Sequence, residues 1–188
     1  MGPHLKAWLA AIAAEAGSVV VVPGGGPFAD AVRVAQGSMG FDDGAAHDMA
    51  LMAMAQFGRA LQGLDPLFRL AGSRSAIFRA LKNSAVPVWS PEPMARGAAL
   101  PESWDLTSDS LAAWLAGALS ADQLAIVKHG RFVEAAYDVD DLVAQGVVDR
   151  LFPHYLRQSR VRAWLTASTD SAAFAEGLRR KAFPEILR

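Results

Sequence analysis

Three consecutive glycines follow a run of valines and precede a proline near the start of the sequence. They belong to the stretch VVVVPGGGPFADAVR, in which Gly24, Gly25 and Gly26 separate an apolar run at residues 19–22 from a predicted helix beginning at Pro27. The first backbone N–H groups of a helix lack partners inside it, and glycines let an anion approach them without meeting a Cβ. The pattern predicts a binding site for a phosphate or a carboxylate. A plain tight turn is the alternative interpretation.

Two known glycine motifs fit this turn poorly. The P-loop needs a lysine after its last glycine, whereas Gly26 precedes Pro27. The dinucleotide pattern G-x-G-x-x-G/A is met by Gly24, Gly26 and Ala29, but its acidic partner should end a second strand about 20 residues further on. The acidic residues in that region are Asp42, Asp43 and Asp48, beside or inside a predicted helix. An NAD-binding oxidoreductase is therefore only a weak alternative.

A second group of polar residues precedes an apolar helix in the stretch PESWDLTSDSLAAWLAGAL. Its members are Trp104, Asp105, Thr107, Ser108, Asp109 and Ser110. One or two of them serve as ordinary helix caps. Capping alone does not explain a tryptophan with two carboxylates and three hydroxyls. A carboxylate here can hold Mg²⁺ or orient a lysine, and the hydroxyls can bind a substrate.

A lysine is expected at the same edge of the sheet. Lys128 follows the apolar run at residues 124–127, and ligands of open α/β sheets bind at the carboxyl ends of the strands. A solvated strand end is the alternative for Lys128. A lone histidine such as His47 is more often structural than catalytic, and neither a metal-binding spacing nor a G-x-S-x-G motif is present. We therefore expect no metal site built by the protein alone.

Apolar periodicity predicts an α/β protein with a mainly parallel sheet, because strands and helices alternate along most of the chain. The expected strands are residues 19–22, 86–89, 124–127, 132–137 and 161–167. The expected helices are residues 5–16, 28–35, 45–64, 75–82, 109–119, 138–144, 150–158 and 171–181. We expect a single domain over residues 1–188.

Composition narrows the classes of function. The chain has 188 residues, 52% of them hydrophobic and 20% charged, with a net charge of −1. The near-neutral charge argues against a nucleic-acid partner, and no apolar run is long enough for a membrane helix. The absence of cysteine removes disulfides and thiolate chemistry and is typical of a reducing compartment. We expect a cytoplasmic protein.

Three stretches together resemble the amino-acid kinase superfamily, which includes acetylglutamate, glutamate, aspartate and uridylate kinases. They are VVVVPGGGPFADAVR, AAHDMALMAMAQFG and SWDLTSDSLAAWLA, in the order and spacing of that superfamily. The chain is most similar to the small branch that includes the aminomethylfuran phosphate kinase of methanofuran biosynthesis. The resemblance covers residues 18–169.

The resemblance implies a three-layer αβα sandwich like that of acetylglutamate and carbamate kinases. It implies transfer of the γ-phosphoryl of ATP, with Mg²⁺, to a small acceptor. Asp109 matches the aspartate that positions catalytic lysines, and Lys128 or Arg157 is the candidate for the positive charge. The glycine turn, Thr107 and Ser108 would contact the acceptor or the transferring phosphoryl, and the remaining candidate binding residues are Arg33, Trp104 and Asp105.

The sequence departs from the superfamily at its start. Members normally begin with a strand ending in Lys-x-Gly-Gly-Ser, whereas residues 5–16 already read as the following helix and Lys6 lies inside it. The predicted function is an ATP-dependent small-molecule kinase acting on a hydroxyl, carboxylate or phosphate, with methanofuran-type one-carbon cofactor synthesis as its expected context. A catalytically degenerate nucleotide or anion sensor on the same fold is the alternative. We expect a homo-oligomer, since the apolar helix at residues 45–64 can serve an interface.

Overall fold

The computed structural model describes residues 3–174, 176 and 183–188 of the chain. It contains two compact units, each with its own sheet. One unit is Glu15–Trp104, called here the 15–104 unit. The other combines Met1–Ala14 with Asp105–Arg188 and is called the 105–188 unit.

The sheet of the 15–104 unit is parallel. Strands β1 (Phe68–Ala71) and β2 (Val86–Trp89) pair in register from end to end. Val21 adds a parallel bridge to Val88 on the other side of β2, with its N–H donating to a β2 carbonyl at 2.9 Å. All four residues of β2 are buried, because the strand is paired on both sides and covered by helices.

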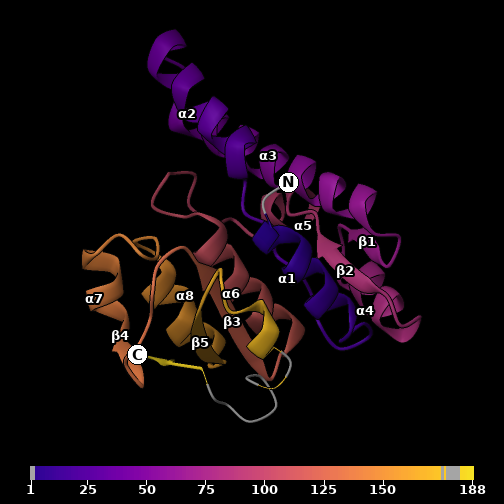
Figure 1. Ribbon diagram of the computed structural model, residues 1–188. Helices are drawn as coiled ribbons and strands as arrows, with labels where there is room; N and C mark the ends of the chain where they lie inside the picture. Colours follow the sequence, from indigo (N-terminus) through magenta and orange to yellow (C-terminus); the bar gives the residue numbers. More distant parts are fainter. Residues whose placement is uncertain (1–2, 175, 177–182) are drawn as a thin grey trace. The chain divides into compact units, whose positions relative to one another are not determined.

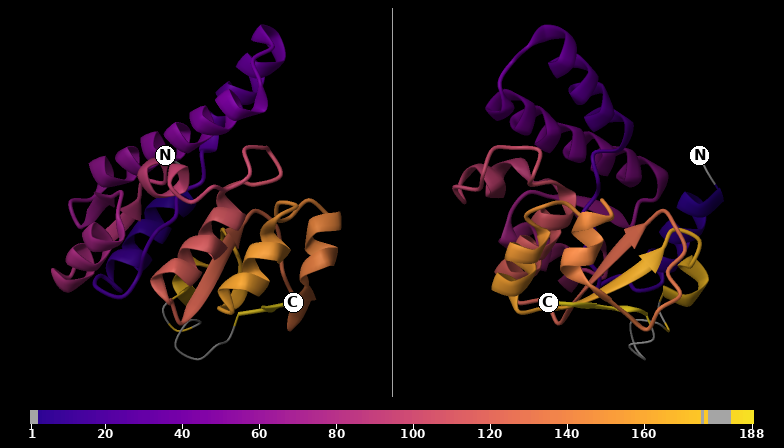
Figure 2. Two further views of the ribbon diagram at one scale, coloured as in Figure 1. Left: turned by 180° about the vertical axis from the view of Figure 1, so that it is seen from behind. Right: turned by 90° about the vertical axis from the view of Figure 1, so that its left-hand side faces the viewer.

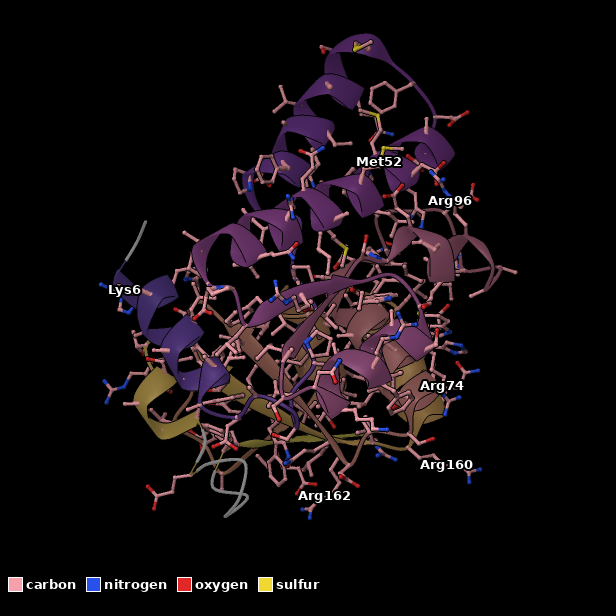
Figure 3. The ribbon with its side chains drawn as sticks, turned by 90° about the vertical axis from the view of Figure 1, so that its right-hand side faces the viewer. Lys6, Met52, Arg74, Arg96, Arg160 and Arg162 are labelled. Carbon is pink, nitrogen blue, oxygen red and sulfur yellow. The ribbon has the colours of Figure 1, made fainter. Side chains whose placement is uncertain are left out.

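Four helices accompany this sheet. They are α2 (Gly26–Met39), α3 (Asp43–Leu64), α4 (Arg74–Lys82) and α5 (Glu92–Arg96). Helices α2 and α3 form a hairpin, as Figure 2 shows in two views. Gly40, in the left-handed conformation, ends α2, and the Asp42 carboxylate caps α3 by accepting from the Ala45 N–H at 2.8 Å. Arg96 of α5, labelled in Figure 3, ties that helix to α3 through an ion pair with Asp48 at 3.2 Å.

The 105–188 unit contains a mixed sheet in the order β3-β5-β6-β4. The strands are β3 (Gln123–Lys128), β4 (Ala136–Asp138), β5 (Arg162–Ala167) and β6 (Glu185–Leu187). The β3–β5 and β4–β6 pairs are parallel, and β5–β6 is antiparallel. Arg162, labelled in Figure 3, joins β5 to β6 through a 3.1 Å ion pair with Glu185.

In the 105–188 unit, helix α6 lies beside helix α8 (Figure 1). The elements are α1 (Pro3–Ala13), α6 (Ser108–Leu119), α7 (Val139–Ala144), α8 (Phe152–Ser159) and the short 3₁₀ helix η1 (Ser171–Ala173). A Cβ at Gly117 of α6 would lie 3.1 Å from the Cα of Ser159, so the absence of a side chain lets the two helices approach closely. Trp8 of α1 anchors that helix by donating to the Ser168 carbonyl at 2.7 Å.

Each unit has its own fully buried apolar core. In the 15–104 unit the large side chains with no exposure are Phe68, Ile77 and Trp89. In the 105–188 unit the corresponding side chains include Phe152 and Leu165. These residues come from strands and from the helices packed on them, which is the layered arrangement that amphipathic elements require.

The predicted α/β class with mainly parallel pairing is confirmed. Two details of the sequence prediction are wrong. Residues 19–22 were expected as a buried strand, but they are half-buried and make one bridge. Residues 132–137 were expected to be extended, but the strand is Ala136–Asp138. Residues 171–181 were expected as a helix, which begins as the 3₁₀ helix η1; residues 175 and 177–181 lie outside the described part, so the rest of this helix stays a prediction.

Two short strands were not predicted. Strand β1 contains an exposed arginine and β6 has three residues, so neither provides the apolar run on which strand prediction depends. Within the described residues, none of the helices has the length and apolar character required to cross a membrane. The prediction of a single domain over residues 1–188 stays a prediction beside the two compact units.

Candidate functional site

Lys128 and Asp109 form an ion pair in the 105–188 unit. Lys128 is the last residue of β3, and Asp109 is the second residue of α6. The Lys128 Nζ lies 2.7 Å from the Asp109 Oδ2. Asp109 as a whole residue is 8% exposed, whereas the side chain of Lys128 is 26% exposed. The Lys128 side chain is therefore partly exposed at the carboxyl end of a strand, while its carboxylate partner is buried.

Burial dominates the electrostatics of Asp109. Desolvation raises the pKa of its carboxyl group above the usual value, and the Asp149 charge acts in the same direction. The Lys128 charge and its hydrogen bond oppose this rise, as does a hydrogen bond from the Asp149 backbone, but the net shift of the pKa is upward. The negative form of Asp109 thus depends on its lysine partner.

The first turn of α6 is held by Asp149, a residue that sequence reasoning missed. Its Oδ2 accepts from the Thr107 N–H at 3.0 Å, the Thr107 hydroxyl at 2.8 Å and the Ser110 N–H at 3.0 Å. Its Oδ1 accepts a short hydrogen bond from the Ser110 hydroxyl. No local pattern identifies Asp149, because its partners lie 39 and 42 residues earlier in the chain.

Polar residues also meet at the carboxyl ends of β3 and β5. The Ser168 N–H donates to the Lys128 carbonyl at 2.8 Å, and the Ser168 hydroxyl lies 3.2 Å from His129 Nδ1. His129 is exposed and Ser168 is half-buried. These contacts extend the strand pairing by one residue and place hydroxyl and imidazole groups next to Lys128.

The glycine turn lies in the 15–104 unit and opens α2. Gly25 is the N-cap and makes no side-chain cap, and a Cβ there would lie 2.4 Å from the Ala29 Cβ. Gly26 has a φ of +52°, and a Cβ there would lie 3.0 Å from two ring atoms of Phe57. Close packing therefore requires Gly25 and Gly26, as the tight-turn interpretation expects. Gly24 and Gly26 are nevertheless exposed, so the turn is open to solvent.

Arg33 and Trp104 are brought together in the 15–104 unit. The Arg33 guanidinium lies 4.3 Å from the centroid of the Trp104 ring and 3.1 Å from the Asp30 carboxylate. The Trp104 indole N–H donates to the Gln36 side chain at 2.7 Å. Arg33 and Gln36 are one turn apart on α2, so this helix holds both the ring and the cation above it.

The other predicted residues have different positions. The boundary between the units falls between Trp104 and Asp105, so the stretch singled out in the sequence is divided. Asp105 is an exposed carboxylate, 3.9 Å from the Arg150 guanidinium. Thr107 donates its hydroxyl to Asp149, and Ser108 is the half-buried first residue of α6.

The acidic residues after the glycine turn have structural roles, which contradicts the dinucleotide interpretation. That motif needs an acid at the end of a second strand, whereas α2 leads directly into α3. Asp42 caps α3, and Asp48 pairs with Arg96. His47 is buried, and desolvation lowers its pKa, as expected for a structural histidine. Among the described residues, no group of three or more carboxylate or histidine side chains is arranged to hold a metal ion.

The chain is similar to known kinases in sequence and in fold, although no protein-family model matches it. A curated relative, the kinase of (5-(aminomethyl)furan-3-yl)methyl phosphate from Methanocaldococcus jannaschii, is 24% identical over 166 residues, covering 78% of this chain and 72% of the relative. The uridylate kinase of Archaeoglobus fulgidus has a TM-score of 0.70 at 15% identity, covering 97% of this chain and 92% of that one. The UMP kinase of Ureaplasma parvum has a TM-score of 0.69 at 17% identity, covering 98% and 87%. The expected three-layer α/β fold is thus confirmed.

Proposed function

We propose that this chain is a member of the amino-acid kinase superfamily and that it transfers the γ-phosphoryl group of ATP to a small acceptor. The relatives and the solved structures of its fold are kinases, which supports phosphoryl transfer as the reaction class.

The Lys128–Asp109 ion pair is the observation that carries this proposal. Phosphoryl transfer needs positioning and neutralisation of negative charge more than covalent chemistry by the protein. Lys128 supplies a cation whose side chain is 26% exposed, at the carboxyl end of β3. Asp109, buried in α6, accepts one hydrogen bond from it at 2.7 Å and so orients the ammonium group. An ammonium group has three donors, and the hydrogen bond to Asp109 uses one of them.

The 15–104 unit supplies the elements suited to an anionic acceptor. The exposed glycine turn leads into α2, whose N-terminal end has no side-chain cap and no acidic residue in its first turn. The backbone N–H groups and the dipole at such an end favour a negative charge. Arg33, half-exposed over Trp104, adds a guanidinium group suited to a phosphate or a carboxylate.

Magnesium fits this protein as an ion bound to the nucleotide. Within the described residues no ligand cluster builds a metal cage. Mg²⁺ usually takes one or two protein carboxylates, several waters and substrate phosphates, so such a cage is not needed. When bound with the nucleotide, the ion would supply positive charge that offsets the negative charge of the phosphates. Asp109 is a buried carboxylate of the 105–188 unit, and its Oδ2 is already paired with Lys128.

We infer that the acceptor is a phosphate monoester on a small ring. The curated relative acts on an aminomethylfuran methyl phosphate, and the two structural neighbours are kinases of uridylate. In this reaction an oxygen of the acceptor phosphate bonds to the γ-phosphorus, the bond to the β-bridging oxygen breaks, and ADP leaves. A furan phosphate in methanofuran-type cofactor synthesis is the specific acceptor that we propose.

The test is ADP release from ATP and Mg²⁺ with a panel of acceptors. The panel contains (5-(aminomethyl)furan-3-yl)methyl phosphate, UMP, the unphosphorylated furan alcohol and N-acetylglutamate. We expect turnover only with phosphate monoesters, and its loss in Lys128→Met. Lys6→Met, which changes an exposed lysine of α1 in the same unit, is the matched control and should keep full activity.

Two outcomes would contradict the proposal. Full activity of Lys128→Met would remove the ion pair from the mechanism. Thermal stabilisation by ATP and Mg²⁺, without ADP release with any acceptor of the panel, would instead support the nucleotide or anion sensor.

A further inference from the structure

Asp149 makes four hydrogen bonds at a helix end that is distant from it in sequence. The residue lies between α7 and α8 and is half-buried. All four hydrogen bonds come from Thr107 and Ser110, one from each backbone N–H and one from each hydroxyl. Thr107 occupies the N-cap position but makes no side-chain cap of its own. Asp149 therefore caps α6 in its place.

This cap encloses the residue that pairs with Lys128. Asp109 lies between Thr107 and Ser110 in the sequence. The Asp149 carboxylate therefore holds the backbone on both sides of Asp109. The Asp149 backbone also forms a hydrogen bond with the Asp109 carboxyl group. Burial raises the pKa of Tyr155, and the negative charge of Asp149 adds to this rise.

We propose that Asp149 is a positioning residue for phosphoryl transfer, holding the first turn of α6 so that Asp109 keeps Lys128 in a single orientation. This inference rests on the proposed function. Asp149 does not touch the ammonium group in this arrangement but acts through Asp109. A misplacement of about 1 Å in a catalytic group can reduce a rate by roughly 100-fold, so a cap at this point can control the rate without binding any substrate.

The test compares Asp149→Asn with Asp138→Asn. Asparagine keeps the shape but has one acceptor oxygen, so it cannot receive the hydrogen bonds of both Thr107 and Ser110 in full. Asp138 caps α7 in the same unit, accepting from the Asp140 N–H at 2.8 Å, and is the matched control. We expect kcat to fall roughly 100-fold in Asp149→Asn, with KM for ATP changed by less than about threefold. Asp138→Asn should lower stability without lowering kcat.

A second measurement does not depend on activity. In ¹⁵N-labelled protein the Lys128 ammonium group, held by Asp109, should give a protected ¹H–¹⁵N signal that disappears in Lys128→Arg. We expect this signal to broaden or vanish in Asp149→Asn and to persist in Asp138→Asn. If the wild type shows the signal but transfers no phosphoryl group, the proposed function fails while the structural part of the inference is still tested.

Two results would overturn the inference. The first is a kcat of Asp149→Asn equal to that of Asp138→Asn, and the second is an unchanged Lys128 signal in Asp149→Asn. If Asp149→Asn does not fold, Ser110→Ala is the substitute, because it removes only the hydrogen bond from the Ser110 hydroxyl to Asp149. It should give a smaller fall in kcat and the same broadening of the Lys128 signal. An unchanged kcat and signal in Ser110→Ala would then count against the inference.

Discussion

Helices α6 and α2 begin in opposite ways, and the contrast shows where an external anion can bind. The first turn of α6 contains Asp109 and is capped by the carboxylate of Asp149, so its positive end is already occupied by the protein's own negative charges. The start of α2 has glycines and a proline, with no acidic residue and no side-chain cap. A helix whose end is satisfied internally positions a lysine, whereas one left unsatisfied is suited to a ligand.

The largest expected effect is at the start of α6. Asp109→Asn should reduce phosphoryl transfer by roughly 10³-fold, because the neutral amide no longer orients the Lys128 ammonium group by a charge-assisted hydrogen bond. The fold should remain intact, since a buried amide is less costly to desolvate than a carboxylate. ADP release and urea denaturation, each compared with the exposed variant Asp122→Asn, measure the two effects. Near-normal activity in Asp109→Asn would show that α6 does not direct the lysine.

The next largest effect is a loss of stability caused by a substitution at the start of α2. Gly26→Ala combines a left-handed φ of +52° with a Cβ only 3.0 Å from the Phe57 ring, and should cost about 1–3 kcal/mol of unfolding free energy. Gly37→Ala is the matched control in the same helix, where a Cβ meets nothing within 4 Å. It should be neutral or stabilise by up to about 1 kcal/mol. Equal unfolding free energies for the two variants would contradict the packing argument.

Features that depend on adjacent residues can be predicted from the sequence, whereas contacts between packed helices cannot. The cap of α3 by Asp42 and strand β2 follow from local signals, namely a polar residue before a helix and a short apolar run. Gly26 was recognised, but its contact with Phe57 depends on how α2 packs against α3.

The partners of Asp109 divide along the same line. Lys128 was predicted at the end of a strand, because the apolar run before it is visible in the sequence. Asp149 could not be predicted, since its hydrogen bonds span about 40 residues and its own neighbours carry no motif. Capping rules search the adjacent residues, and a cap delivered by another loop leaves no local pattern.

The pH dependence of stability should distinguish a buried acid from an exposed one. The pKa of Asp109 is raised above the usual 3.8 in the folded protein, so the native state binds this proton more tightly than the unfolded state. Its contribution to stability is therefore full below pH 3.8 and is lost as the pH rises through the native pKa. The unfolding free energy of the wild type, relative to Asp109→Asn, should fall over that window. A constant difference from pH 3 to about 7 in urea denaturation would mean that burial does not control this group.

The smallest expected effect is that of substituting Arg33, a cationic residue of α2, on KM for the acceptor. Arg33→Lys keeps the charge but loses the planar contact with the Trp104 ring, which is worth about 0.5–1 kcal/mol at an exposed site. If Arg33 binds the acceptor phosphate, KM for the acceptor should rise several-fold while kcat and KM for ATP stay constant. Arg74→Lys is the control, because the Arg74 guanidinium lies 5.5 Å from the centroid of the Phe78 ring. The same KM in both variants would limit the anion-binding role of α2 to its glycine turn, because Arg33, about two turns further along the helix, would then contribute only to the packing of Trp104.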